Sequence, residues 1–147
     1  MDMKLIINQT PEIEETEIVI RCSYVTPELR DIIDRINLYS VTLQGKLGDS
    51  IYNIPASNIL YIDSVERKSF LYGSQNTYEC KRKLYELEDL LKNLNFIRIS
   101  KNTIVNIKAI KSVKPIEVSR MEVQLKNGEK LIVTRNYLKN FKKSFGL

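Results

Sequence analysis

The sequence contains no histidine, and it has only two cysteines and five glycines among 147 residues. Without histidine the chain cannot build a Ser-His-Asp or Cys-His nucleophile, a histidine-bearing zinc site or an imidazole acid–base step. Cys22 and Cys80 cannot complete a tetrahedral zinc site alone, and we interpret both as reduced core or half-buried residues. No glycine stands in a GxGxxG or GxxxxGKS/T frame, which leaves a phosphate-binding loop unsupported. We therefore expect neither a metal nor a cofactor.

Long apolar runs are absent as well. No run approaches the ~18 residues that a membrane-spanning helix needs, and the chain opens with Met-Asp-Met-Lys rather than with a signal sequence. We therefore expect no contact with a membrane and predict a cytoplasmic location.

The charges are divided unevenly along the chain. Residues 1–66 carry 5 Lys and Arg against 11 Asp and Glu, whereas residues 67–147 carry 18 against 7. The net charge of +5 thus conceals an acidic front of −6 and a basic remainder of +11. A basic remainder of this size favours a polyanionic partner, and a Lys-rich surface kept for solubility is the alternative.

The hydrophobic pattern predicts an α+β chain, in which a mostly antiparallel β-rich domain with short helices follows a small strand–strand–helix element. Residues 4–8 and 16–22 are expected to be strands because apolar side chains alternate there, and a helix is expected to begin at Pro27. The acidic front meets the β-rich remainder near residue 40. We therefore divide the chain into a small αβ element, residues 1–40, and a β-rich domain, residues 41–147.

Turn and capping residues locate further elements. Residues 59–64 and 68–72 are predicted to pair as a hairpin, and Asn127-Gly128 suits a type I′ turn in a second hairpin. Leucines at helical spacing predict a helix over residues 82–94.

Two helix starts carry capping signals. Thr26 is a candidate N-cap before Pro27, and Thr134 is a candidate N-cap for a last helix from Arg135 to Phe145.

An enzymatic role has little support. The acids cluster at residues 12–17 and on the exposed face of the predicted 82–94 helix, where solvation explains them, and Asp63 fits a strand-end carboxylate. We predict no catalytic residue and no small-molecule substrate.

Basic residues recur at predicted strand ends and turns, where loops at one edge of a β scaffold can present them to one partner. They are Arg67, Lys68, Arg98, Lys101, Lys108, Lys111, Lys114, Arg135, Lys139, Lys142 and Lys143. Such residues neutralise phosphates, Arg matches guanine edges, and polar residues such as Asn102 and Asn136 donate to phosphates. The pattern favours nucleic-acid binding; a protein-interaction module is the alternative, and a small enzyme ranks third.

Several ordered blocks resemble one family. Residues 96–106 (Phe-Ile-Arg-Ile-Ser-Lys-Asn-Thr-Ile-Val-Asn), residues 110–113 and residues 123–137, with Asn-Gly and Val-Thr-Arg, are similar to the LytTR DNA-binding domain of bacterial transcription regulators. Residues 59–64 and the Leu-rich residues 84–94 match its upstream strand and helix. The resemblance covers residues 43–146 and is specific because whole blocks match in order.

The resemblance implies an elongated, mostly antiparallel β fold whose loops bind double-stranded promoter DNA sequence-specifically, in neighbouring major grooves and on the backbone between them. The residues that it implicates at bases are Arg67, Lys68, Ser69 and Arg135. Those that it and the charge pattern implicate at phosphates or the minor groove are Lys101, Asn102, Asn136, Lys139 and Lys142. The alternative is a regulatory module of this family that has lost DNA binding.

Two departures from the family concern mechanism. Some members carry histidine in the first loop and at the position of Ser100, so this chain must contact DNA differently there. Many members also carry a receiver domain of over a hundred residues, whereas only about 40 residues precede the resemblance here. The chain therefore resembles a stand-alone, response-regulator-like member. We hypothesise that its front packs on the β domain or makes a homodimer through the Ile-rich helix that begins at Pro27.

Overall fold

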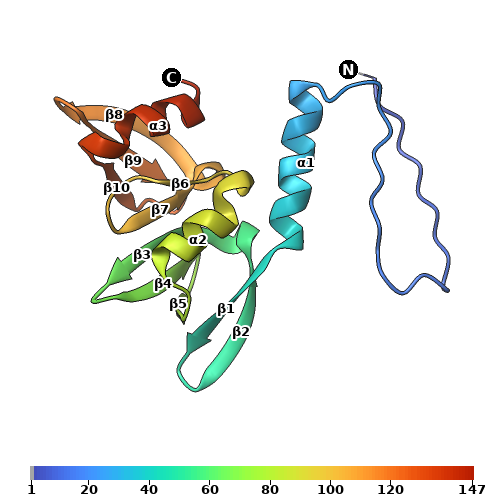
Figure 1. The fold of residues 1–147 in the computed structure, drawn as a ribbon, viewed down its shortest axis with the longest axis horizontal. Helices are drawn as coiled ribbons and strands as arrows, with labels where there is room; N and C mark the ends of the chain where they lie inside the picture. Colours follow the sequence, from blue (N-terminus) through green and yellow to red (C-terminus); the bar gives the residue numbers. More distant parts are fainter. Residues whose placement is uncertain (1) are drawn as a thin grey trace.

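The computed structural model describes residues 2–147, which contain three α-helices and ten β-strands. Figure 1 shows the strands gathered in one body, with α1 beside it and the N-terminal segment beyond α1. The helices are α1 (Pro27–Ser40), α2 (Leu84–Leu91) and α3 (Arg135–Phe145), and 3-10 turns cover Ala56–Asn58, Lys92–Leu94 and Ile107–Ala109. The strands are β1 (Thr42–Leu47), β2 (Ser50–Pro55), β3 (Ile59–Val65), β4 (Lys68–Gly73), β5 (Thr77–Cys80), β6 (Phe96–Arg98), β7 (Thr103–Asn106), β8 (Ile110–Glu117), β9 (Arg120–Leu125) and β10 (Lys130–Val133).

The strands form two sheets. Seven strands follow the order β2-β1-β5-β4-β3-β7-β6, and three follow the order β10-β9-β8. The strand pairs in both sheets are antiparallel, as short hairpin connections allow. The predicted mostly antiparallel α+β fold is therefore confirmed.

Each sheet buries apolar side chains together with a helix. Leu87 of α2 is fully buried in a cluster with Ile62 of β3 and Leu71 of β4. Phe141 of α3 is fully buried in a second cluster, which contains Val123 of β9. In both helices apolar residues recur at spacings of three and four, so each helix has one apolar face that must be covered.

Tyr61 of β3 connects the two sheets. Its hydroxyl donates to Glu129 Oε2 in the β9–β10 turn at 2.8 Å, and its ring stacks on Tyr72 with centroids 4.2 Å apart. Burial, and then the bond to Glu129, raises the pKa of Tyr61 above its usual range. The hydroxyl therefore keeps its proton, and this link between the sheets, into more alkaline solution than an ordinary tyrosine does.

α1 begins where its capping signal predicts. Leu29 N–H donates to Thr26 Oγ1 at 3.1 Å, and Leu29 and Leu38 are buried. Lys108 Nζ lies 2.6 Å from Asp31 Oδ1, which ties the helix to the body and lowers the pKa of the Asp31 carboxyl. The apolar stripe of α1 is half-buried against the body.

The two strands predicted over residues 4–8 and 16–22 do not form. Residues 2–25 are exposed along their whole length and contain neither helix nor strand. The alternation that predicted strands is present, but two strands without a covered face are at best marginal in water. Cys22, expected at a core or half-buried position, is exposed for the same reason. Cys80 is buried as expected, and burial raises the pKa of its thiol.

The second predicted hairpin forms with a different turn. Leu125 N–H donates to Glu129 O at 2.8 Å, so three residues, 126–128, lie between this bonded pair instead of the two of a type I′ turn. Gly128 alone has a positive φ, +94°, whereas Asn127 does not. The type I′ prediction is therefore wrong, because glycine at the third position of a three-residue loop satisfies the same sequence.

Candidate nucleic-acid interface

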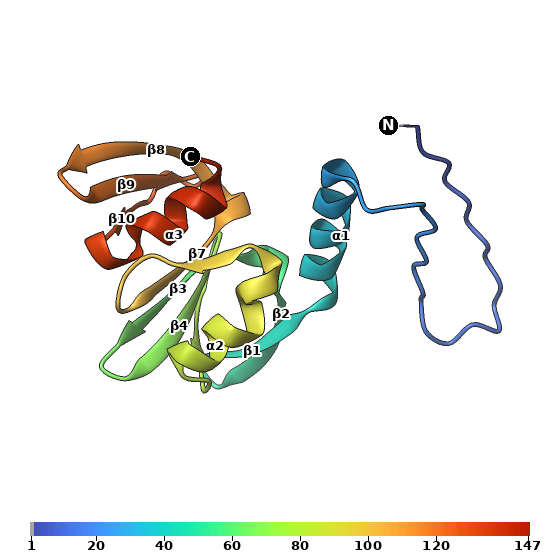
Figure 2. The same cartoon turned by 45° about the horizontal axis from the view of Figure 1, so that its top comes forward.

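Three connecting segments lie along one edge of the body. They are the β3–β4 turn, the loop of residues 99–102 between β6 and β7, and the start of α3, all at the left in Figures 1 and 2. Ser64 N–H donates to Asn102 O at 2.8 Å, and Thr134 N–H donates to Ile99 O at 2.9 Å. The middle loop is thus bonded to both of its neighbours. We call the surface made by these three segments the loop edge.

The β3–β4 turn holds two non-glycine residues in the left-handed region. Glu66 has φ +52° and Arg67 has φ +68°, between the paired residues Val65 and Lys68. Positive φ at both positions matches the twist of the strands, as in a type I′ turn, yet each L-residue there costs roughly 1–2 kcal/mol. Lys83 Nζ donates to Arg67 O at 3.3 Å and supports this conformation. Backbone strain of this kind concentrates at functional positions. The turn presents the Arg67 side chain to solvent.

Replacing the turn by its preferred residues should separate stability from binding. In the double variant Glu66→Asn/Arg67→Gly we expect the free energy of unfolding to rise by about 1 kcal/mol, because both residues tolerate positive φ. Affinity for DNA should nevertheless fall, because the guanidinium is gone. Urea unfolding followed by circular dichroism and a DNA titration measure the two effects. A variant that gains stability and binds DNA as tightly as the parent chain would remove Arg67 from the interface.

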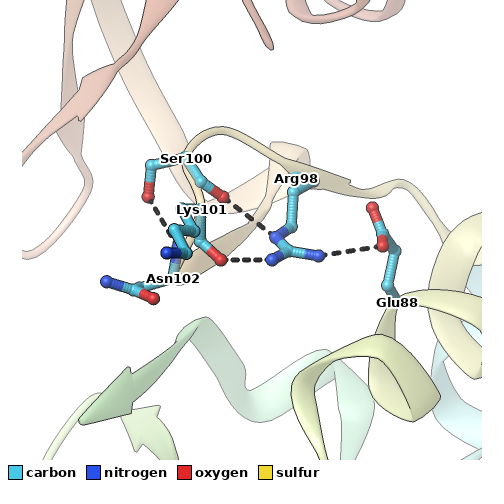
Figure 3. Close-up of polar contacts among 5 residues, drawn as sticks. All are labelled: Glu88, Arg98, Ser100, Lys101 and Asn102. Carbon is cyan, nitrogen blue, oxygen red and sulfur yellow. Dashed lines mark hydrogen bonds and ion pairs between the residues drawn. The ribbon is translucent and has the colours of Figure 1, made fainter. Parts of the chain in front are cut away.

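Arg98 shapes the middle loop (Figure 3). Its Nε donates to Ser100 O at 2.9 Å, and another guanidinium nitrogen, Nη2, donates to Lys101 O. Nη1 donates to Glu88 Oε1 of α2 at 3.0 Å, and the guanidinium lies 5.9 Å from the centre of the Tyr137 ring of α3. The guanidinium fork therefore holds two successive loop carbonyls while being fixed by α2 and α3. From the sequence Arg98 is one of the basic residues expected to neutralise phosphates, whereas in the structure its guanidinium pairs with the Glu88 carboxylate.

The loop that Arg98 holds presents its side chains outward. Lys101 and Asn102 are exposed, and in Figure 3 the Asn102 side chain points away from the guanidinium. Asn102 N–H donates to Ser100 Oγ at 3.3 Å, which closes the turn from within. Hydrogen bonds between the loop backbone and the side chains of Arg98 and Ser100 thus fix the loop, and the side chains of Lys101 and Asn102 remain available to a ligand.

α3 forms the third part of the loop edge. Its predicted bounds, Arg135–Phe145, are confirmed, although Thr134 Oγ1 donates to Ile99 O at 3.4 Å instead of capping the helix. Because Phe141 faces the core, the opposite side of α3 is exposed. The predicted residues on the exposed side are Arg135, Asn136, Lys139 and Lys142. The first two lie at the loop edge, and the two lysines continue the basic surface along the helix.

Ser69 does not belong to this surface. Ser69 is only 2% exposed. The neighbouring Lys68 is exposed, and its Nζ lies 3.8 Å from Glu79 Oε1. β4 alternates, so Ser69 points to the same side as the buried Leu71. The expected DNA contact by Ser69 therefore conflicts with its burial. The position of Leu71 two residues later was the sequence signal that should have excluded it.

A basic run that was not among the predicted site residues lies beside the β3–β4 turn. Lys81, Arg82 and Lys83 follow β5 and are exposed, and β5 pairs with β4 so that Cys80 lies opposite Ser69. The bond from Lys83 to the carbonyl of Arg67 shows how close this run lies to the β3–β4 turn. Three consecutive basic residues at a strand end were the available signal. The run adds positive charge to the loop edge beside the β3–β4 turn.

Asp63 has a structural role beside the loop edge. Asp63 Oδ1 accepts a hydrogen bond from Thr103 Oγ1 at 3.2 Å, a strand-end role that agrees with its interpretation from sequence. Among residues 2–147 no three Cys, Asp or Glu side chains are placed to hold a metal ion. Within the same residues no helix is long and apolar enough to cross a membrane.

Comparison with known proteins identifies the domain. Residues 49–146 match the family model described as the LytTr DNA-binding domain. A solved LytTr DNA-binding domain from Bacillus cereus superposes with a TM-score of 0.69 at 29% identity, over 72% of this chain and 97% of that one.

Curated relatives agree with the family match. The sensory transduction protein LytT of Enterococcus faecalis is 30% identical over 108 residues, and the transcriptional regulatory protein LytR of Staphylococcus aureus is 31% identical over 109. Each alignment covers 74% of this chain and 44% of the relative, so the chain spans less than half of their length.

A further relative matches over the whole chain. An uncharacterized HTH-type transcriptional regulator of Staphylococcus aureus is 28% identical over 149 residues, covering 100% of this chain and 99% of that protein. In residues 2–147 of this chain five strands separate α1 from α2 and five more separate α2 from α3, so no helix-turn-helix pair occurs there. The family model covers most of the chain, including the whole loop edge. The chain therefore belongs to the LytTr DNA-binding domain family.

Proposed function

We propose that the protein is a transcription regulator that binds double-stranded promoter DNA sequence-specifically through the loop edge. The observation that supports this most is that three exposed basic segments are joined by backbone hydrogen bonds, Ser64 to Asn102 and Thr134 to Ile99. A ligand that spans all three segments must be long and negatively charged, as duplex DNA is. Loops held in fixed register can also distinguish sequences, because base edges must meet side chains in one geometry.

The side chains divide into two classes. Arg67, Lys68 and Arg135, at the two ends of the loop edge, are suited to base edges in neighbouring major grooves, because Arg and Lys donate to guanine O6 and N7. The middle and flanking residues are suited to phosphates. They are Lys101, Asn102, Asn136, Lys139 and Lys142, and charged or amide donors of this kind set register without specifying sequence.

The proposal extends to the whole chain. Residues 41–147 act as the DNA-binding domain, and residues 1–40 serve a contact other than DNA, because that front is acidic. The protein acts in the cytoplasm as a response-regulator-like member of its family, without a cofactor or small-molecule substrate, and as a homodimer. A protein of Staphylococcus aureus described as a transcriptional regulator aligns with the whole of this chain, which supports a role in transcription regulation.

A selection experiment tests the proposal. The full chain is incubated with a library of random duplexes, and bound molecules are amplified over several rounds. We expect one motif to be enriched, because fixed Arg and Lys side chains discriminate base pairs. If no motif emerges and the chain instead binds a protein tightly, the family member has lost DNA binding and acts as a regulatory module.

A salt titration on the enriched duplex gives the number of phosphate contacts. The logarithm of the affinity should fall linearly with the logarithm of the salt concentration, with a slope of about −0.9 for each phosphate neutralised. A scrambled duplex of equal length is the control and should show a similar slope with weaker binding. A flat dependence on salt would contradict binding through the basic surface.

A further inference from the structure

The N-terminal segment, residues 2–25, exposes an unusual amount of apolar surface. We call it the arm. It extends beyond α1, away from both sheets, in Figures 1 and 2. Ten of its large apolar side chains are exposed, including Leu5 at 86%, Ile7 at 77% and Ile18 at 62%. Exposed apolar side chains concentrated in one segment are typical of an interaction surface, so we expect the arm to be covered by a partner.

The backbone of the arm also lacks partners. Within residues 2–25 the one hydrogen bond between described backbone groups runs from Ile13 N–H to Thr10 O, at 3.2 Å. Two stretches on either side of this turn are rich in residues that favour strands, Leu5, Ile6 and Ile7 in the first and Ile18, Val19 and Ile20 in the second. Each stretch therefore has strand-forming side chains and free hydrogen-bonding groups, but no neighbour.

We infer that the arm pairs with the arm of a second copy of this chain. A two-stranded hairpin is marginal in water, whereas three or more strands with a shared apolar face are stable. Two arms supply four such stretches, which is enough for one sheet. The size agrees as well, because a standard interface uses about 20–30 residues and roughly 800 Å² on each side, and the arm offers 24 residues with ten exposed apolar side chains.

The charge of the arm favours a second copy of the chain as its partner and an antiparallel pairing of the two arms. The arm carries five acidic side chains against two basic ones, so it is repelled by DNA and by anionic membranes. Four of the acids lie at residues 12–17, at the tip of the arm. A two-fold axis that pairs the arms antiparallel separates the two tips and directs each toward the other copy, whose residues 26–147 carry a net charge of +8. This interface is independent of the loop edge, which stays free for DNA.

Charge substitutions in the full chain test the inference. In Ile18→Asp/Ile20→Asp each symmetric dimer would bury four new carboxylates, so we expect the dissociation constant of the dimer to rise on the order of a hundredfold or more. Sedimentation velocity should give the mass of two 17.1 kDa chains for the parent and of one chain for the variant. The thermal unfolding of the separated chains should not change, because both side chains are exposed and lie outside the two core clusters.

A matched control lies outside the arm. Val118, at the β8–β9 turn, is 96% exposed, and Val118→Asp should leave the dimer intact. Amide hydrogen exchange adds a direct measurement: residues 16–22 should be protected in the parent at high concentration and unprotected in the Ile18→Asp/Ile20→Asp variant. The inference is overturned if the parent is a single chain at about 100 µM, about a hundred times a dissociation constant of 1 µM. It is equally overturned if the arm variant stays dimeric, or if Val118→Asp dissociates the dimer as fully.

The same samples separate this inference from the proposed function. If the Lys142→Ala variant binds DNA weakly but still sediments as a dimer, the substitution affects DNA binding and not the pairing of the arms. An Ile18→Asp/Ile20→Asp chain that sediments as one copy should still bind a single site, because the loop edge belongs to one copy. The inference rests on the homodimer of the proposed function, so a single-chain parent counts against both of them. DNA binding and arm pairing can nevertheless fail separately.

Discussion

Arg98→Ala is expected to lower both the stability of the domain and its affinity for every DNA sequence. The guanidinium makes three hydrogen bonds, to Ser100 O, Lys101 O and Glu88 Oε1, and its side chain is only 19% exposed. Hydrogen bonds to charged groups contribute about 1.5–3 kcal/mol each, and bonds within one network are not additive. We therefore expect the free energy of unfolding to fall by about 2–4 kcal/mol, measured by urea unfolding.

The effect on DNA follows from the shape of the loop. Without the guanidinium, the carbonyls of Ser100 and Lys101 lose the group that holds them, and Lys101 and Asn102 no longer meet the backbone in a fixed register. A loss of about tenfold or more in affinity is the expected result, since ordering a loop on binding costs about 1–2 kcal/mol for each residue fixed. Sequence preference should persist, because Arg67 and Arg135 are untouched.

Two controls distinguish this role from a direct contact. Lys101→Ala removes an exposed side chain but keeps its carbonyl, so stability should stay within about 0.5 kcal/mol while DNA affinity falls. Arg98→Lys keeps the charge but cannot hold two carbonyls and a carboxylate at once, so it should resemble Arg98→Ala. If Arg98→Ala leaves stability unchanged and reduces the salt slope by about 0.9, then Arg98 binds a phosphate and does not position the loop.

Elements whose signals are local could be predicted from the sequence. α3 begins directly after Thr134, the predicted N-cap position, and the spacing of Leu138, Phe141 and Phe145 predicts the rest of its length. α1 begins at its Thr-Pro pair for the same reason, and the β3–β4 hairpin follows from alternation on both sides of a short polar gap. In each case the residues that determine the element lie inside it or next to it.

Features that depend on distant partners could not be predicted. The alternation in the arm indicates strands, but it does not say whether another strand lies alongside. Nor does a Glu-Arg pair indicate a turn with two positive φ angles, since the Lys83 side chain that supports Arg67 comes sixteen residues later. The convergence of the three loops depends on backbone hydrogen bonds between segments 35 and 38 residues apart, which no local pattern records.

The candidate site was partly predictable for a related reason. The sequence patterns located many of its exposed residues, because strand ends and turns are the parts of a β scaffold that reach a ligand. They did not distinguish surface from interior within a strand, so they included Ser69, which is buried, and they did not include the basic run at Lys81. Alternation within β4 and the charge run itself were sufficient to correct both.

Arg135→Ala and Lys142→Ala should weaken DNA binding in different ways, although both side chains belong to α3 and both are exposed. In the described part of the chain neither has an ion-pair partner, so each substitution should change stability by less than about 0.5 kcal/mol. Any change in affinity then reports on the contact with DNA. Arg135 lies at the loop edge beside the anchored 99–102 loop, whereas Lys142 lies about two turns farther along the helix.

We expect Arg135→Ala to cost about 1–3 kcal/mol on the selected duplex and to relax the preference at one base pair, because a bidentate contact to guanine discriminates by that amount. Lys142→Ala should instead weaken selected and scrambled duplexes equally and reduce the salt slope by about 0.9, the signature of one lost phosphate contact. Titrations of both variants on duplexes substituted at each position measure the difference. If the two variants lose affinity uniformly and alike, Arg135 contacts only the backbone, and sequence must be recognised from the β3–β4 turn instead.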